Sequence, residues 1–171
     1  VKSGLMIIDQ KRAHERILFE QYLRSLAMNF PVAQRTLFPE TIELDQADYI
    51  VLREIMDDLH AIGFDIRDFG SNSVVIAGYP AESKFENPKE LLEVFLEKFK
   101  STDTDIKTSV REKIARSLAV AGSVNYGETL SHKMMQDLVD ALFACESPGY
   151  SPSGKPIVVI MGIDEVEKKF K

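Results

Sequence analysis

The sequence predicts an α+β fold (mixed α/β), with short strands near both ends of the chain and helices between them. Apolar runs at residues 4–8 and 157–161 have the length and the branched side chains of buried strands. Segments 11–27, 45–62 and 131–145 instead repeat apolar residues at helical spacing. The 171 residues, of which 44% are hydrophobic and 28% charged, suffice to build a globular core.

The first part of the chain is predicted to run from a strand through a helix into extended segments. Residues 4–8 are expected to be a strand because Gly-Leu-Met-Ile-Ile is short and apolar throughout. A helix over 11–27 follows, because its apolar side chains recur at roughly helical spacing, and Pro31 ends that stretch. Residues 36–38 and 41–44 are expected to be extended, the second with alternating apolar and polar side chains.

The middle of the chain is predicted to combine a capped helix with a hairpin. Asp45 is placed to cap the N-terminus of a helix that runs through Ile62 and is closed by Gly63. Residues 64–69 and 73–77 are then expected to pair as a hairpin, because a Gly-Ser-Asn turn separates two β-rich runs.

The second half is predicted to be mainly helical until the last strand. Helices are expected over residues 88–100, 107–121 and 131–145. Pro88 occupies the first helical position, where its missing N–H leaves no bond unmade, and Ser131 is a candidate N-cap. Residues 146–156 contain three prolines and two glycines, so turns are expected there before the strand at 157–161. A short terminal helix is expected to begin at Asp164.

Charge and cysteine content exclude several functional classes. The net charge of −6 argues against strong DNA binding by this segment alone, because phosphate neutralisation needs a surplus of basic residues. The one cysteine, Cys145, excludes an internal disulfide and a cysteine-rich zinc cluster. The longest apolar runs are too short to span a bilayer. The chain begins at Val1 with no visible signal peptide, and it is expected to be a fragment of a longer protein.

Five segments resemble, in the same order, landmarks of the MutL C-terminal domain. They are residues 8–17, 119–127, 138–145, 151–156 and 164–170. The first, Ile-Asp-Gln-Lys-Arg-Ala-His-Glu-Arg-Ile, resembles the family's Asp-Gln-His-Ala-x-x-Glu signature. The fourth, Ser-Pro-Ser-Gly-Lys-Pro, lies where the family has Cys-Pro-His-Gly-Arg-Pro. The resemblance covers essentially the whole chain and implies a two-lobed domain, with a dimerisation lobe and an inserted regulatory lobe.

In nuclease-active members of this family, these segments form a metal site that hydrolyses phosphodiester bonds. Zinc in such a site favours cysteine and histidine ligands. This chain has other residues at the four corresponding positions, namely Lys11, Val120, Ser151 and Ser153. A protonated ammonium does not ligate a metal, and the only cysteine lies elsewhere. The resemblance therefore implies a domain that has lost the zinc-dependent endonuclease and binds no metal or other cofactor in this fragment.

Three acidic positions of the family remain, and they allow two interpretations. They are Asp9, Glu15 and Glu20. The first interpretation is a residual carboxylate site for Mg²⁺ or Mn²⁺, which prefer oxygen ligands. The second, which we favour, is that Glu15 pairs with Lys11 at the four-residue spacing that supports a helix. Glu20 has Arg16 and Arg24 at the same spacing, and it diverges from Glu15 by ~140° around a helix.

Residues 34–39 resemble the peptide through which MutL proteins contact the replication sliding clamp. The positions that carry the resemblance are Gln34, Leu37, Phe38 and Pro39. Such a peptide places a glutamine amide and two apolar side chains in a preformed hydrophobic cleft. The alternative is that Leu37 and Phe38 face the local core from a strand, with Pro39 at a sheet edge.

The resemblance also implies a two-fold dimer, whose interface would use one apolar patch twice. The candidate regions are the apolar faces of the helix 131–145 and of the strands near 5–8 and 157–161. The residues singled out on them are Leu138, Val139, Leu142, Ile157 and Val159. The same side chains could equally be buried within one subunit, because apolar periodicity does not show what a face packs against. By resemblance, the dimerisation lobe combines residues 1–45 with 119–171, and the regulatory lobe is 46–118.

The implied function is an assembly module for DNA mismatch repair, which holds two ATPase-bearing chains together as a clamp on DNA. The implied partners are a second copy of the chain, the mismatch-recognition protein MutS and the sliding clamp. DNA would be bound weakly and through the full-length protein, and no membrane association is expected. ATP and Mg²⁺ would bind to the N-terminal domain of that protein. The resemblance also implies that the protein acts in the bacterial cytoplasm, in association with the nucleoid. The main alternative is a nicking endonuclease with a carboxylate-only metal site, and a weaker one is an unrelated α/β ligand-binding domain.

Overall fold

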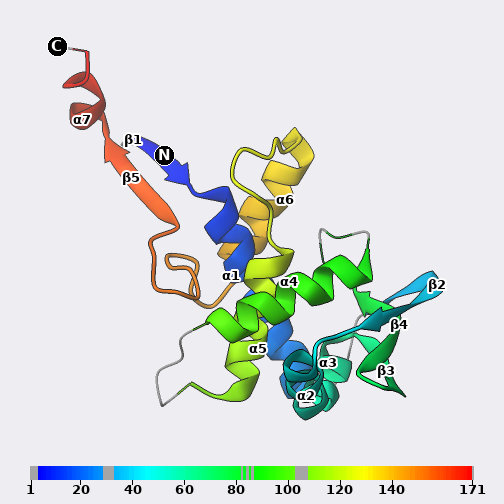
Figure 1. Ribbon diagram of the computed structural model, residues 1–171. Helices are drawn as coiled ribbons and strands as arrows, with labels where there is room; N and C mark the ends of the chain where they lie inside the picture. Colours follow the sequence, from blue (N-terminus) through cyan, green and yellow to red (C-terminus); the bar gives the residue numbers. More distant parts are fainter. Residues whose placement is uncertain are drawn as a thin grey trace. The chain divides into compact units, whose positions relative to one another are not determined.

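The computed structural model describes residues 4–28, 33–81, 83, 85, 87–102 and 108–170. The chain divides into two compact units, of which unit 1 comprises residues 1–17 and 124–171 and unit 2 comprises residues 18–123 (Figure 1). Both units combine helices with a small antiparallel sheet, which confirms the α+β class.

Unit 1 is built on a two-stranded sheet that joins the two ends of the chain. Its elements are β1 (Gly4–Ile8), the first turns of α1 (Gln10–Met28), α6 (His132–Phe143), β5 (Val158–Gly162) and α7 (Ile163–Glu167). Strands β1 and β5 run antiparallel, from Gly4 opposite Gly162 to Ile8 opposite Val158. A Cβ atom at Gly4 would collide with the carbonyl oxygen of Met161, so glycine permits the close approach at this end.

The core of unit 1 is small. Its buried members are Ala13, Ile17, Leu142 and Ile157. Partly buried residues around them include Ile8 at the end of β1 and Leu138 on α6. A core of this size covers only one end of the sheet and one side of α6. Among the described residues of unit 1, several large apolar side chains of the sheet and of α6 therefore stay exposed.

Unit 2 holds the larger core, beneath a three-stranded antiparallel sheet in the order β2-β4-β3. Its elements after α1 are β2 (Ala33–Glu43), α2 (Gln46–Glu54), α3 (Met56–Ile62), β3 (Asp65–Gly70), β4 (Ser73–Pro80), α4 (Pro88–Ser101) and α5 (Val110–Gly122). Helix α4 contacts β2, β4 and α5 (Figure 1). It buries Leu91, Leu92, Phe95 and Leu96, whose helical spacing places them along one side of the helix as an apolar stripe.

Local signals explain where several elements begin and end. The side chain of Asp45 accepts the N–H of Asp48 and caps α2, while Ser131 accepts the N–H of Met134 and caps α6. Gly63 ends α3 in the left-handed region, at φ 118°. Between β3 and β4, Ser71 and Asn72 both have positive φ, as a tight two-residue hairpin turn demands.

Two sequence expectations about the architecture differ from the structure. The helix expected from 45 to 62 is broken at Ile55, although no glycine or proline marks that position. Ile55 has φ −107° and ψ 7°, outside the helical region, although its N–H still donates to the carbonyl of Val51. The boundary between the units lies after residue 17 rather than after 45, because the rest of α1, from Leu18, packs in the core of unit 2.

The second boundary lies after residue 123 rather than after 118. The assignment of a dimerisation role to one lobe and a regulatory role to the other stays a prediction. Among the described residues, no helix combines the length and the apolar character needed to cross a membrane.

Candidate functional site

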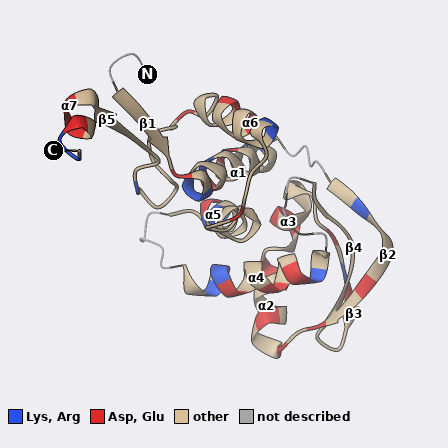
Figure 2. Ribbon diagram, turned by 90° about the horizontal axis from the view of Figure 1, so that it is seen from above, with Lys and Arg blue, Asp and Glu red and all other residues tan. Residues whose placement is uncertain are grey.

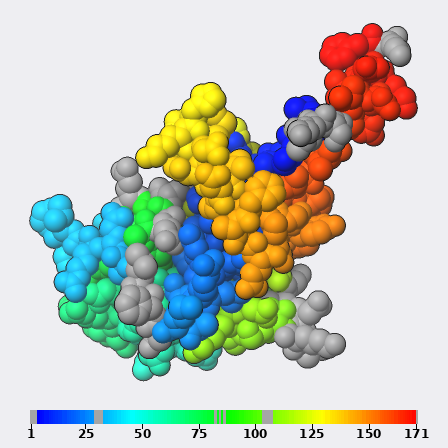
Figure 3. All heavy atoms as spheres, turned by 180° about the vertical axis from the view of Figure 1, so that it is seen from behind, coloured from blue at the N-terminus to red at the C-terminus, as the bar shows by residue number. Residues whose placement is uncertain are grey.

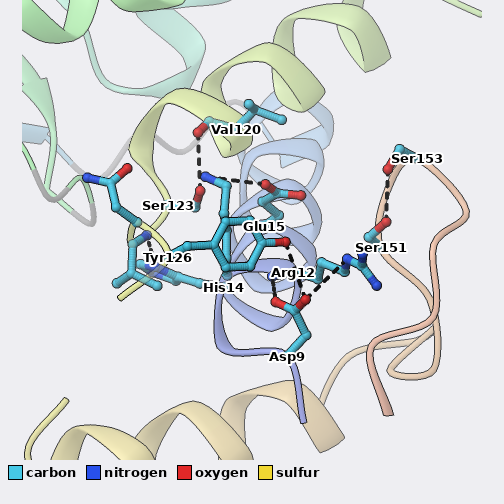
Figure 4. A network of polar contacts seen from close by, with 12 residues as sticks. Asp9, Arg12, His14, Glu15, Val120, Ser123, Tyr126, Ser151 and Ser153 are labelled. Carbon is cyan, nitrogen blue, oxygen red and sulfur yellow. Dashed lines mark hydrogen bonds and ion pairs between the residues drawn. The ribbon is translucent and has the colours of Figure 1, made fainter. Parts of the chain in front are cut away.

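Asp9 lies at the junction of β1 and α1 and organises the first turn of that helix (Figure 4). Its Oδ1 atom accepts the backbone N–H of Arg12 at 3.0 Å, which satisfies one of the donors that a helix N-terminus leaves without a partner. Its Oδ2 atom lies 3.2 Å from Nε of Arg12 and accepts the hydroxyl of Tyr126 at 3.3 Å. Both carboxylate oxygens of Asp9 are therefore engaged by neighbouring residues of unit 1.

Glu15 and Lys11 form an ion pair one helical turn further along α1, at the four-residue spacing that predicted such a pair. The Lys11 Nζ and Glu15 Oε1 atoms are 3.6 Å apart, and the two side chains are only 19% and 11% exposed. Burial raises the pKa of the Glu15 carboxyl above its usual value, and the adjacent Lys11 ammonium opposes part of that rise. The Lys11 ammonium also lies 5.9 Å from the centre of the Tyr126 ring.

The loop that carries Tyr126 is fastened to α1 by two long-range hydrogen bonds. Nδ1 of His14 accepts the backbone N–H of Val124 at 3.1 Å. Nε2 of Gln10 donates to the carbonyl of Glu128 at 2.8 Å. Because the loop is held at both ends, Tyr126 reaches Asp9 (Figure 4). The Tyr126 ring also lies near the ammonium of Lys11.

The serines of the 146–156 loop stabilise the loop itself. Oγ of Ser151 accepts the backbone N–H of Lys155 at 3.1 Å and shares a hydrogen bond of 3.0 Å with Oγ of Ser153 (Figure 4). Nη1 of Arg12 donates to the carbonyl of Pro156, and Nε of Arg16 donates to the carbonyl of Tyr150. The loop is thus an ordered turn held against α1, as its proline and glycine content predicted.

These residues do not fit the metal site of the nuclease-active members of the family that the sequence resembles. Lys11 presents an ammonium, and the hydroxyls of Ser151 and Ser153 are bonded to each other. Val120 belongs to α5 of unit 2, and its carbonyl accepts the Ser123 hydroxyl. Across the described ranges, no group of three or more His, Cys, Asp or Glu side chains is arranged to hold a metal ion. Glu20, the third acidic candidate, belongs to unit 2.

The sheet of unit 1 exposes a continuous apolar surface. Leu5 pairs with Met161 and Ile7 with Val159 across the two strands, so their side chains form one face. Leu5, Ile7 and Val159 are about half exposed although they are large and apolar. Neither strand contains a charged residue, as Figure 2 shows. Two strands alone are marginally stable in water, so a face of this kind calls for additional cover.

Helix α6 adds a second apolar area in the same unit. Met134 and Met135 are exposed, and Leu138 and Val139 are half-buried. Two shallow hollows of about 260 Å³ and 160 Å³ share Leu130 and Leu138 as lining residues, and the helix lies open on the surface in Figure 3. Flexible methionine side chains are common on surfaces that receive a partner.

Two of the predicted interface residues require correction. Leu142 and Ile157 are 0% and 1% exposed and belong to the core of unit 1. They therefore offer no surface to a second copy. Leu138, Val139 and Val159 do reach the surface, and so do Leu5 and Ile7 of the first strand, whose apolar face was also a predicted candidate. Met134 and Met135, on the predicted helix face, are exposed as well, although neither was singled out from the sequence. Leu5 and Ile7 alternate along β1, a pattern hidden by its wholly apolar composition.

The segment that resembles a clamp-binding peptide protrudes from the edge of the unit 2 sheet. Strand β2 pairs with β4 at Arg35 opposite Gly78 and again at Glu40 opposite Ile76, with an irregularity between these pairs. Within it, Leu37 is 92% and Phe38 82% exposed. The alternative that these two side chains face the local core is wrong. Gln34 and Pro39 are exposed as well.

Comparison with known proteins agrees with these features. Residues 1–130 match the family model described as the MutL C terminal dimerisation domain. Three relatives carry the name DNA mismatch repair protein MutL. That of Bacteroides fragilis is 40% identical over 171 residues, that of Phocaeicola vulgatus 38% over 171, and that of Chlorobium chlorochromatii 37% over 170.

The matched regions cover 99–100% of this chain but only 26–28% of the three relatives. The chain thus spans about a quarter of the length of the proteins it resembles. With the family model covering most of the chain and relatives sharing more than a third of its residues, the chain belongs to the MutL C-terminal dimerisation domain family.

Proposed function

We propose that this domain joins two copies of its parent chain through unit 1. The observation that carries the proposal is the apolar surface of β1, β5 and α6, several of whose large side chains are about half exposed among the described residues. Soluble monomers rarely expose contiguous apolar areas of this kind, and larger ones mark association sites. Membership of a dimerisation family supports a second copy as the occupant.

The composition of the surface also favours self-association. A two-fold interface places each residue near the same patch of its partner, so an uncharged surface meets no repulsion from its own copy. Strands β1 and β5 meet that condition because both lack charged side chains. Obligate homodimer interfaces are also more apolar than ordinary protein surface.

The direct test is the mass of the domain in solution. Light scattering at tens of micromolar is expected to give twice the 19.3 kDa mass of one chain. A mass of one chain at that concentration would contradict the proposal. Dilution into the nanomolar range then measures the dissociation constant.

In the parent protein, the dimer would hold two ATPase-bearing chains together as a clamp on DNA and would recruit the mismatch-recognition protein MutS. ATP and Mg²⁺ would act in the parent protein's N-terminal domain, with no cofactor in this one. A nicking endonuclease is the less favoured alternative, because Asp9 is engaged by Arg12 and Glu15 by Lys11. Loss of the dimer would therefore impair mismatch repair by separating the two chains, and not by removing a DNA-nicking activity of this domain.

We further propose that residues 34–39 dock on the replication sliding clamp. The support is the exposure of Leu37 and Phe38, two large apolar side chains at neighbouring positions of an interrupted strand. Burying them in a cleft of a partner would remove this apolar surface from water. Gln34 would supply the amide that orients the peptide in the cleft.

Replacing both Leu37 and Phe38 with alanine is expected to weaken binding to the isolated clamp by roughly 30-fold or more, because aromatic and aliphatic anchors dominate such contacts. Thermal stability should change little, since both side chains are exposed. Phe69→Ala, which removes an exposed aromatic side chain from β3 of the same unit, is the matched control. Equal clamp affinity for the double variant and this control would refute the docking proposal.

A further inference from the structure

We propose that the Lys11 ammonium is a built-in cation, which takes the charge-balancing place of a divalent metal ion beside Asp9 and Glu15. The domain would then keep its acidic cluster without a metal, and removal of the lysine charge would create affinity for one. The inference concerns the fold of unit 1 and does not depend on how the domain associates.

The carboxylate of Glu15 needs a nearby positive charge because it is largely removed from water. The whole residue is 9% exposed, and an unpaired charge at such a position is strongly destabilising. Asp9 adds to this need, because its negative charge acts on Glu15 in the direction that raises the Glu15 pKa. Two carboxylates thus share one small region of unit 1.

Lys11 is positioned to supply that charge. Its ammonium lies 3.6 Å from Glu15 and its side chain is 19% exposed, so water screens the pair far less than it screens a surface ion pair. The Tyr126 ring lies 5.9 Å from the same ammonium, and its hydroxyl donates to Asp9. Tyr126 therefore connects the lysine to the second carboxylate. Lys155 also acts on Glu15, in the direction that lowers its pKa.

The same arrangement explains why a metal ion does not suit the native site. A divalent cation beside Glu15 would meet the Lys11 charge at close range, and like charges in a poorly solvated region repel strongly. With a neutral side chain at position 11, the Glu15 carboxylate would instead lack a cation and offer the hard oxygen ligands that Mg²⁺ and Mn²⁺ prefer.

The test is thermal unfolding of Lys11→Met in EDTA and again in millimolar Mn²⁺ at matched ionic strength. In EDTA the Tm is expected to fall by roughly 5–10 °C, because one partner of a largely buried pair is lost. Mn²⁺ is expected to restore at least half of that loss, while the native chain shows no Mn²⁺-dependent shift. Lys11→Met combined with Glu15→Gln should lose the metal response, because the carboxylate is gone.

Lys89→Met is the matched control, since Lys89 and Glu93 have the same helical spacing but are about half exposed, with 3.9 Å between their charged atoms. Its Tm should change by less than ~2 °C, with no response to Mn²⁺. A Lys11→Met variant as stable as the native chain in EDTA, or one that Mn²⁺ does not stabilise, would overturn the proposal. If this variant unfolds in EDTA, refolding in Mn²⁺ supports the inference, and failure to refold while the double variant folds refutes it.

Discussion

Replacing Val159 with lysine is expected to convert the domain from a dimer to a monomer at micromolar concentration. Val159 lies on the exposed face of β5, opposite Ile7, and is 51% exposed in the single chain. A lysine there costs the folded chain little, because its ammonium reaches water. In a two-fold dimer the same change places two charges in an apolar interface. The dissociation constant should therefore rise by on the order of 100-fold or more.

The control for this variant is Ile50→Lys. Ile50 lies on α2 of unit 2 and is 50% exposed, so the two substitutions change charge and polarity at equally accessible aliphatic side chains. Sedimentation of the control should match that of the native chain. A dimer that survives Val159→Lys, or one that is lost equally in Ile50→Lys, would place the interface elsewhere.

Truncating Leu142 to alanine is expected to lower the free energy of unfolding by about 2–5 kcal/mol. Leu142 is fully buried and packs with Ala13, Ile17 and Ile157 in the core of unit 1. That core is small, so the cavity is a large perturbation to the unit. The same residue had been a candidate for the interface from its helical spacing, and the experiment separates the two roles.

Chemical denaturation under conditions where the native and variant chains are monomeric measures the effect of Leu142→Ala. The neighbouring substitution Phe143→Ala is the control, because Phe143 is half exposed on the same helix and should change stability by only a few tenths of a kcal/mol. Similar losses in both variants, or a loss for Leu142→Ala that appears only in the dimer, would contradict the burial of Leu142 within one chain.

Signals local to the sequence predicted the helix and turn boundaries well. Asp45 and Ser131 cap their helices through hydrogen bonds of their own side chains, and Gly63 is needed for one positive φ. Such features depend on neighbouring residues alone. The break at Ile55 could not be predicted in this way, because neither a glycine nor a proline marks that position.

The candidate sites divide in the same way. The Lys11–Glu15 pair follows from helical spacing, whereas the approach of Tyr126 depends on a loop more than a hundred residues away in the chain. Helical and strand periodicity likewise identified apolar faces without showing which of them the chain itself covers. For that reason the sequence predicted both Leu142 and Val159 as interface residues, although the structure buries Leu142 and exposes Val159.

Hydrogen–deuterium exchange at two protein concentrations tests most directly whether unit 1 is the dimer surface. The exchange of the native chain is first measured at a protein concentration above the dissociation constant of the dimer. It is then compared with the exchange of the Val159→Lys variant, or of the native chain diluted until it is monomeric. Added protection on association is expected in peptides from Gly4–Ile8, His132–Phe143 and Val158–Gly162. Protection confined to Ala33–Glu43 and Ser73–Pro80 of unit 2, or the same exchange at both concentrations, would contradict a dimer formed through β1, β5 and α6.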